Sequence, residues 1–135
     1  MQFSEISGEF IVRYFVPGQA TAGTVDDWVL FVCDANITLT ACKLTPNAAI
    51  TANGTNYFDL AVLNKGAAAG GSTSMATRSW AATNSVAFVA ESMTLSGTAA
   101  NLNAATGDVL DLARTVTASG LAMPDMHVEL RYKLR

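Results

Sequence analysis

Few side chains in this sequence could carry out chemistry. His127 is the only histidine, and Cys33 and Cys42 are the only thiols. Catalysis by the imidazole or by a thiol would need a second catalytic side chain within hydrogen-bond reach, and the sequence pairs neither with one. The G-x-S-x-G motif of a nucleophilic serine is missing. We therefore expect that the protein is not an enzyme.

The residues that could bind a metal are also few and scattered. One histidine and two cysteines are too few for a zinc site, and the carboxylates form no D-x-D-x-D-G series. Asp108 follows Gly107, which is typical of a turn. We expect no metal and no cofactor; the remaining alternative is a calcium ion held between loops, as in some sugar-binding jelly rolls.

The two cysteines flank an apparent turn at residues 34–36. A hairpin that turns there would place Cys33 opposite a residue near 37 and not opposite Cys42. We therefore predict two free, buried thiols in a protein assembled inside the cell, and a disulfide is the alternative.

The composition favours an exterior that other subunits cover. Charged residues make up 14% of the chain, against roughly 25% in ordinary globular proteins. Ala, Thr, Ser, Asn and Gly account for 65 of the 135 residues. Small uncharged side chains lose little hydration when a partner covers them. The alternative is a monomer with a weakly charged surface.

Charge and hydropathy exclude two classes of partner. The net charge of −3 and the lack of a Lys/Arg cluster argue against nucleic-acid binding. No apolar run approaches the ~18 residues of a membrane span, and residues 1–10 do not resemble a secretory signal. We expect no nucleic acid and no membrane, and a chain that stays in the cytoplasm where it is made.

Short runs rich in Val, Ile, Thr, Phe and Tyr alternate with Gly, Asn, Asp and Pro along the chain. This pattern predicts an all-β, single-domain antiparallel β-sandwich, jelly-roll-like, with about eight strands. The expected strands are 8–16, 27–33, 36–44, 56–64, 73–80, 88–96, 107–116 and 127–135. The Ala-rich pieces between them are predicted to be loops, with at most one helical turn near 99–105.

Residues 17–27 are the best candidate for a linker. They divide the chain into residues 1–26, an N-terminal arm or first strand plus linker, and residues 27–135, the β-sandwich core. Both alternatives for residues 1–16 stay open.

Two of the predicted strands are apolar on both faces. In 8–16, Phe10, Val12, Tyr14 and Val16 alternate with Ile11, Arg13 and Phe15; in 27–33, Trp28, Leu30 and Val32 alternate with Val29, Phe31 and Cys33. Only one face of a sandwich strand meets the core, so the other face needs a second cover, from a loop, a crossing arm or a neighbouring subunit.

The last predicted strand and the tryptophans suggest alternatives to a purely structural role. His127, Glu129, Arg131, Lys133 and Arg135 share one face of that strand, which favours protection of a sheet edge over contact with an acidic partner. Trp28 is expected in the core. Trp80 could lie exposed at a strand end, where it would support carbohydrate binding.

Residues 45–66 and 93–132 resemble the small β-sandwich decoration, or cement, proteins of tailed-bacteriophage capsids. The features that carry the resemblance are Pro46 with 48–51, the strand that closes in Leu63-Asn64-Lys65-Gly66, Leu95 with 99–102, Gly107-Asp108-Val109-Leu110, and 120–125 before the last strand. The resemblance covers about three quarters of the chain, and residues 1–27 lie outside it.

The resemblance implies a structural virion protein that binds the capsid exterior and stabilises the capsid by non-covalent contacts. It implies the major capsid protein as partner, a homotrimer as assembly, and formation in the host bacterial cytoplasm. The alternative is a receptor- or carbohydrate-binding β-sandwich, such as a fibre tip or head fibre. The residues predicted to contact partners are Phe3, Ile6, Phe10, Ile11, Phe15, Val29 and Phe31.

Overall fold

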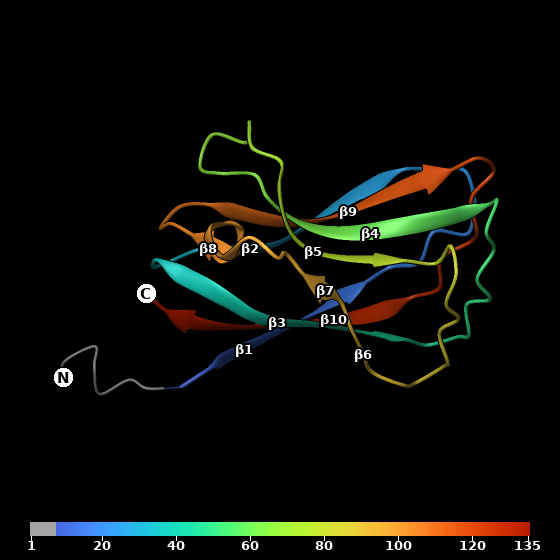
Figure 1. Ribbon diagram of the computed structural model, residues 1–135, viewed down its shortest axis with the longest axis horizontal. Coiled ribbons are helices and arrows are strands. Elements are labelled where there is room, and N and C mark those ends of the chain that lie inside the picture. Colours follow the sequence, from blue (N-terminus) through green and yellow to red (C-terminus); the bar gives the residue numbers. More distant parts are fainter. Residues whose placement is uncertain (1–7) are drawn as a thin grey trace.

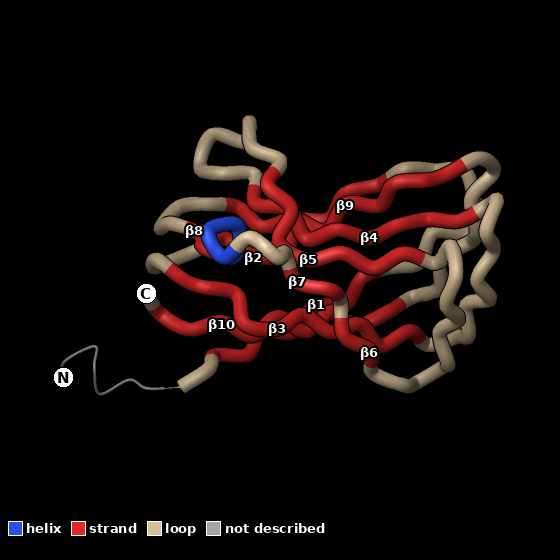
Figure 2. Tube along the Cα trace, viewed as in Figure 1, coloured by secondary structure: helices blue, strands red, loops and turns tan. Residues whose placement is uncertain are grey.

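The computed structural model describes residues 8–135, which form two antiparallel sheets packed face to face (Figure 1). The strands are β1 (Phe10–Val16), β2 (Asp26–Val32), β3 (Ile37–Pro46), β4 (Tyr57–Asn64), β5 (Thr73–Ser79), β6 (Glu91–Ser92), β7 (Thr94–Leu95), β8 (Asn103–Ala104), β9 (Val109–Thr117) and β10 (Met126–Leu134). A short 3₁₀ helix, η2 (Ala99–Leu102), is the helical turn expected near 99–105 (Figure 2). The predicted all-β sandwich is confirmed.

The strand order is that of a jelly roll. The first sheet runs β1-β10-β3-β6, with β8 also paired to β3, and the second runs β2-β9-β4-β5-β7. Four antiparallel pairs are nested: β1 with β10, β2 with β9, β3 with β6, and β4 with β5. In a jelly roll, such nested pairs form one long antiparallel ribbon that folds over into two four-stranded sheets. The two-residue strands β7 and β8 are additions to these sheets.

The predicted strand 88–96 is wrong in its extent, because the chain changes sheet within it. β6 pairs with β3 in the first sheet, whereas β7 pairs with β5 in the second. Met93 lies at the crossing, where its side chain is buried and its N–H donates to the Cys42 carbonyl at 2.8 Å. Residues 88–90 precede the crossing and form a loop.

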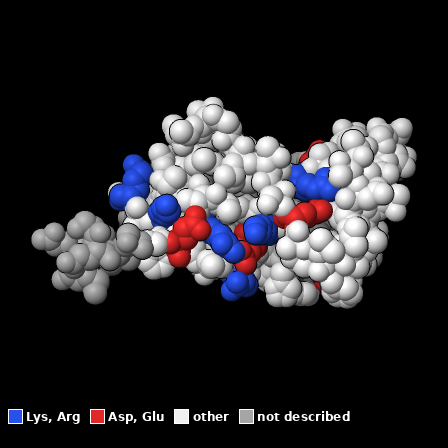
Figure 3. Space-filling view, turned by 60° about the horizontal axis from the view of Figure 1, so that its bottom comes forward, with Lys and Arg blue, Asp and Glu red and all other residues white. Residues whose placement is uncertain are grey.

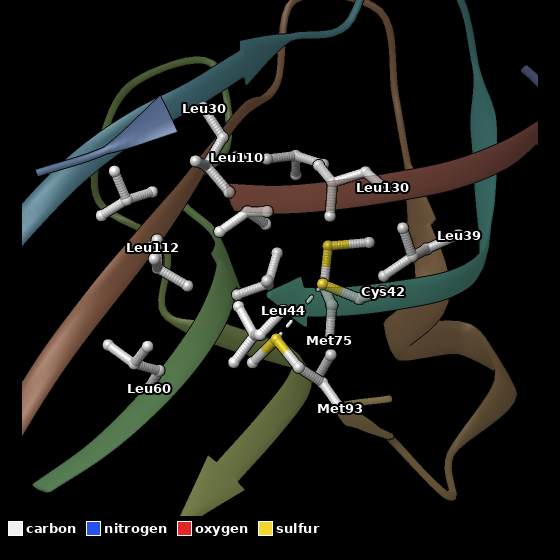
Figure 4. Packing of buried hydrophobic residues seen from close by; sticks show 14 of the residues in the cluster. Leu30, Leu39, Cys42, Leu44, Leu60, Met75, Met93, Leu110, Leu112 and Leu130 are labelled. Carbon is white, nitrogen blue, oxygen red and sulfur yellow. Dashed lines mark hydrogen bonds between the residues drawn. The ribbon is translucent and has the colours of Figure 1, made fainter. Parts of the chain in front are cut away.

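Leucines from both sheets interleave in the core, with sulfur-containing side chains at its centre (Figure 4). The labelled leucines are Leu30, Leu39, Leu44, Leu60, Leu110, Leu112 and Leu130. Cys42 Sγ lies 3.2 Å from Met93 Sδ. Cys33 and Cys42 are both buried and free, as predicted.

A β-bulge in β2 changes which of its side chains face outward. Val29 lies opposite Asp111 and Phe31 lies opposite Leu110, so Leu30 is an extra residue. The extra residue breaks the simple alternation. Val29 and Val32 are exposed, whereas Leu30 is buried and Phe31 packs against the core. The sequence pattern placed Val32 on the same face as Leu30 and Phe31 on the same face as Val29, and both predictions are wrong.

The charged face of β10 does not protect a sheet edge, because β10 lies between β1 and β3. Glu129 instead accepts hydrogen bonds from Arg131 Nε at 2.8 Å and from Arg13 Nε at 3.0 Å. These bonds hold the pKa of Glu129 below its ordinary value, with the Arg131 bond as the largest cause. Glu129 is therefore paired within the molecule, whereas Lys133 and Arg135 leave this face with a net positive charge.

Arg114 is a charged residue inside the sandwich. It follows Leu110 and Leu112 on the inner face of β9 and is 1% exposed. Its Nη2 donates to the carbonyls of Ala22 at 2.9 Å and Leu121 at 2.6 Å, and its guanidinium lies 4.9 Å from the Phe58 ring centre. Burial lowers the pKa of Arg114. Arg114 thus links the β1–β2 connection, through Ala22, and the β9–β10 connection, through Leu121, to the core of the sandwich.

Arg114→Ala should lower the free energy of unfolding by about 3 kcal/mol, since it leaves two carbonyls unpaired and a cavity beside Phe58. Urea denaturation followed by tryptophan fluorescence measures this change. Arg135→Ala, which removes an exposed arginine, is the control and should stay within about 0.5 kcal/mol of the unsubstituted protein. Equal denaturation midpoints for Arg114→Ala and the control would contradict the assigned role.

The buried thiols should make the protein less stable at alkaline pH. Burial raises the pKa of Cys42 from 9.0 to about 12 and that of Cys33 from 9.0 to about 11. Below pH 9 both states keep the thiol protons, so the free energy of unfolding is unaffected. From pH 9 to 12 the unfolded chain releases protons that the folded chain retains, which favours unfolding. In urea denaturation, the free energy of unfolding of Cys42→Ala should fall less between pH 9 and 10.5 than that of the unsubstituted protein. An equal fall in both proteins would refute this account.

Candidate functional site

The residues predicted to contact partners do not form one patch. Phe3 and Ile6 lie outside the described residues. Phe10 and Phe31 both pack against Tyr132, with ring centres 5.5 Å and 5.4 Å from its ring. Phe31 comes from the second sheet and Tyr132 from the first, so this contact joins the two sheets.

Ile11, Phe15 and Val29 are exposed on the two edge strands. Ile11 and Phe15 lie on the outer face of β1, and Phe15 is 61% exposed. Val29 lies on the outer face of β2 and is 70% exposed, with Val25 and Val32 exposed nearby. We call the β1 and β2 edges of the sandwich the open side.

The open side also offers backbone hydrogen-bonding groups. Among residues 8–135, β1 pairs only with β10, and β2 pairs only with β9. A seven-residue edge strand leaves N–H and C=O groups along its free edge, to which another strand can add. The open side therefore combines apolar side chains with unpaired backbone.

A second apolar surface, which the sequence did not reveal, is the loop of residues 86–90. Val86, Phe88 and Val89 are exposed, and Phe88 is 78% exposed, the most of any large apolar residue described. Phe88 has a φ of +60°. A bulky side chain is rarely found in this left-handed conformation. The run VAFVA has the composition of a strand, which is why its exposure was not anticipated.

A polar network anchors the Phe88 loop at both ends. Trp80 Nε1 donates to Ser85 Oγ at 2.7 Å, and Ser85 Oγ donates to Glu91 Oε1 at 2.7 Å. Arg78 Nε donates to the same Glu91 oxygen at 3.1 Å. The Ser85 backbone exchanges two hydrogen bonds with Ile50. The loop is therefore held at Ser85 and at Glu91, and its apolar side chains project between these two points.

Trp80 is part of this network and is not an exposed ring. It is fully buried, with its ring centre 4.4 Å from that of Phe58, and the Arg78 guanidinium lies 4.6 Å from its ring centre. Trp28, expected in the core, is only half-buried at its edge. The expectation of an exposed Trp80 was wrong, because its indole N–H has a buried partner in Ser85.

The Phe88 loop borders a shallow recess of about 270 Å³ on the outer face of the first sheet. The recess is lined by Phe15, Thr45, Pro46, Asn47, Phe88, Asp125, Met126 and His127. The rings of Phe15 and His127 are 5.9 Å apart in an edge-to-face arrangement. Asp125 Oδ1 already accepts a hydrogen bond from the Gly18 N–H at 2.5 Å. We call this surface the Phe88 recess.

The charged side chains lie mainly elsewhere on this face. Figure 3 shows Lys, Arg, Asp and Glu gathered in a band, with largely uncharged surface toward the right-hand end. Residues 86–90 carry no polar side chain. A partner that binds at this end would therefore need few charged side chains of its own.

Two other kinds of site were sought among residues 8–135. No group of three or more His, Cys, Asp or Glu side chains there is arranged to hold a metal ion. None of the described helices is long and apolar enough to cross a membrane.

Comparison of the chain with protein-family models, with curated proteins and with solved structures found no match.

Ser85→Ala should loosen the Phe88 loop, since it leaves the Trp80 indole N–H without a partner and takes one donor from Glu91. A buried unsatisfied donor costs about 1–3 kcal/mol, so the free energy of unfolding should fall by that amount. Amide hydrogen exchange of residues 86–90 should accelerate. Ser72→Ala, at an exposed serine just before β5, is the matched control. Unchanged exchange in Ser85→Ala would show that the network does not hold the loop.

Proposed function

We propose that this protein is a structural, non-enzymatic virion protein that binds the outer surface of a phage capsid and stabilises it by non-covalent contacts. Its partners are the major capsid protein and further copies of the same chain, assembled as a homotrimer. The observation that carries the proposal is the set of large apolar side chains exposed on the edge strands, above all Val29 and Phe15.

Leaving these apolar side chains in water is energetically unfavourable. Monomeric proteins rarely expose large contiguous apolar patches, and those that do commonly use them to bind. Burial of apolar surface contributes roughly 25 cal/mol per Å². Covering Val25, Val29 and Val32 on the open side would therefore favour association, provided that the partner offers a hydrogen-bond donor to Asp27, which is exposed between Val25 and Val29.

Many weak contacts are enough for durable attachment to a repeating surface. A standard interface buries about 800 Å² on each partner. When several copies are linked, each further contact forms at a high effective concentration, so overall attachment exceeds the affinity of any single contact. The free edges of β1 and β2 add the option of strand pairing with the partner.

The alternative function, a receptor- or carbohydrate-binding sandwich, was expected from an exposed Trp80. Because Trp80 is buried beneath Arg78 and against Phe58, that ring offers no platform for a sugar. The open side remains the stronger basis for a function, and it favours a protein surface as the partner.

The purified protein should co-sediment with empty shells of a related phage at a fixed ratio of copies to shell. Val29→Lys combined with Val32→Lys should weaken this binding at least tenfold, because two ammonium groups must then be desolvated at the contact. Binding isotherms from sedimentation at several protein concentrations measure the change.

The control for this experiment is Thr115→Lys, which adds the same charge to an exposed position on the same sheet. It should leave the binding unchanged. The proposal fails if the unsubstituted protein stays in the supernatant with every shell tested, or if the control weakens binding as much as the paired valine substitutions do.

A further inference from the structure

We propose that the Phe88 loop is a self-association site, in which Phe88 of one copy enters the Phe88 recess of a second copy. The inference deepens the proposed function, and rests on it for its biological role, by naming the surface through which copies of the chain contact one another. It is argued from the conformation of Phe88, its anchoring, and the shape and charge of its surroundings.

The monomer gains little from the placement of Phe88. Its side chain is 78% exposed, so it contributes little hydrophobic burial. Its φ of +60° is a conformation that a bulky side chain adopts only at an energetic cost. A glycine or asparagine would suit this backbone better, and neither would expose a phenyl ring to water. The cost is explained if the ring is buried in an assembly.

The loop presents this ring in a fixed position. The Phe88 N–H donates to the Pro46 carbonyl at 2.8 Å, and the Val89 N–H donates to the Val86 carbonyl at 3.3 Å. The Ser85 and Glu91 contacts hold the two ends. An exposed aromatic side chain that is already positioned loses little freedom on binding, and such residues commonly dominate interfaces.

The recess has the size and walls to accept a phenyl ring. Its volume of about 270 Å³ exceeds the ~150 Å³ of an apolar protein cavity that binds benzene. Phe15 and Phe88 are two of its walls, and aromatic rings pair favourably in edge-to-face or offset arrangements. An inserted ring would therefore contact aromatic carbon on two sides.

A second copy of this chain is the occupant that satisfies both features at once. The projecting ring and the recess lie side by side on one surface, so in a trimer each copy can insert its ring into the recess of the next copy around a threefold axis, which covers every ring and fills every recess. The loop carries no charged side chain, and of the recess walls only Asp125 and His127 are ionisable, with Asp125 already bonded to the Gly18 N–H. The loop of a second copy can therefore enter the recess without bringing a charge that needs a partner there.

The test compares self-association of the purified full chain and its Phe88→Gly variant by sedimentation equilibrium, without shells. The unsubstituted protein should associate, and Phe88→Gly should raise the dissociation constant at least tenfold. Because glycine fits the left-handed backbone, the variant diluted to monomer should melt no lower than the diluted unsubstituted protein. Thr45→Lys, which places an ammonium group in the wall of the recess and leaves the open side unchanged, should also weaken association.

Val29→Lys is the control, because it changes the open side and should leave association intact. An unsubstituted protein that is monomeric up to millimolar concentration would overturn the inference, and so would a Phe88→Gly variant that associates normally or melts markedly lower. Shell binding is measured separately. Loss of shell binding with intact Phe88-dependent association would overturn the proposed function but not this contact.

Discussion

One buried hydroxyl, Ser85 Oγ, holds together the part of the molecule on which the surface chemistry depends. It accepts a hydrogen bond from the Trp80 indole and donates one to Glu91, which Arg78 also contacts. Residues 86–90, which lead from Ser85 to β6 and the crossing at Met93, belong to no sheet ladder. The Ser85 network takes the place of such a ladder. It lets an apolar loop stay exposed without collapsing onto the core.

The jelly-roll nesting determines where the molecule can bind. β6 and β7 are joined through the crossing at Met93, which brings one edge of each sheet close to the other. The opposite edges, β1 and β2, belong to the first half of the nested double strand, and no further strand of residues 8–135 pairs with them. Contact between Phe31 and Tyr132 joins the sheets there but leaves the outer faces of β1 and β2 uncovered. The open side is thus a consequence of topology.

Alternation of apolar and polar residues was enough to predict the sandwich and seven of its long strands, because each strand needs one face in the core. The alternation gave wrong side-chain directions where one extra residue forms a β-bulge. The extra residue Leu30 turned Phe31 inward and Val32 outward, and no residue type marks such a bulge. Arg114 was in phase with Leu110 and Leu112, so its inward direction could be predicted, but nothing in the alternation indicates its carbonyl partners, Ala22 and Leu121, which lie in two loops. The exposure of Phe88 and the burial of Trp80 depend on the side-chain network of residues 78–91, which alternation does not reveal either.

The distribution of charge completes the physical picture. Glu129 pairs with two arginines of its own chain, whereas Lys133 and Arg135 form no ion pair among residues 8–135. The exposed residues of the open side and the Phe88 loop are mainly valine and phenylalanine, whose side chains have few rotatable bonds and lose little entropy when they are covered. Because the fold holds these side chains in place before binding, a partner gains their burial without first having to order them. A chain with so few charges can therefore associate through surfaces of modest area, provided that the two sheets and the Ser85 network hold these surfaces in place.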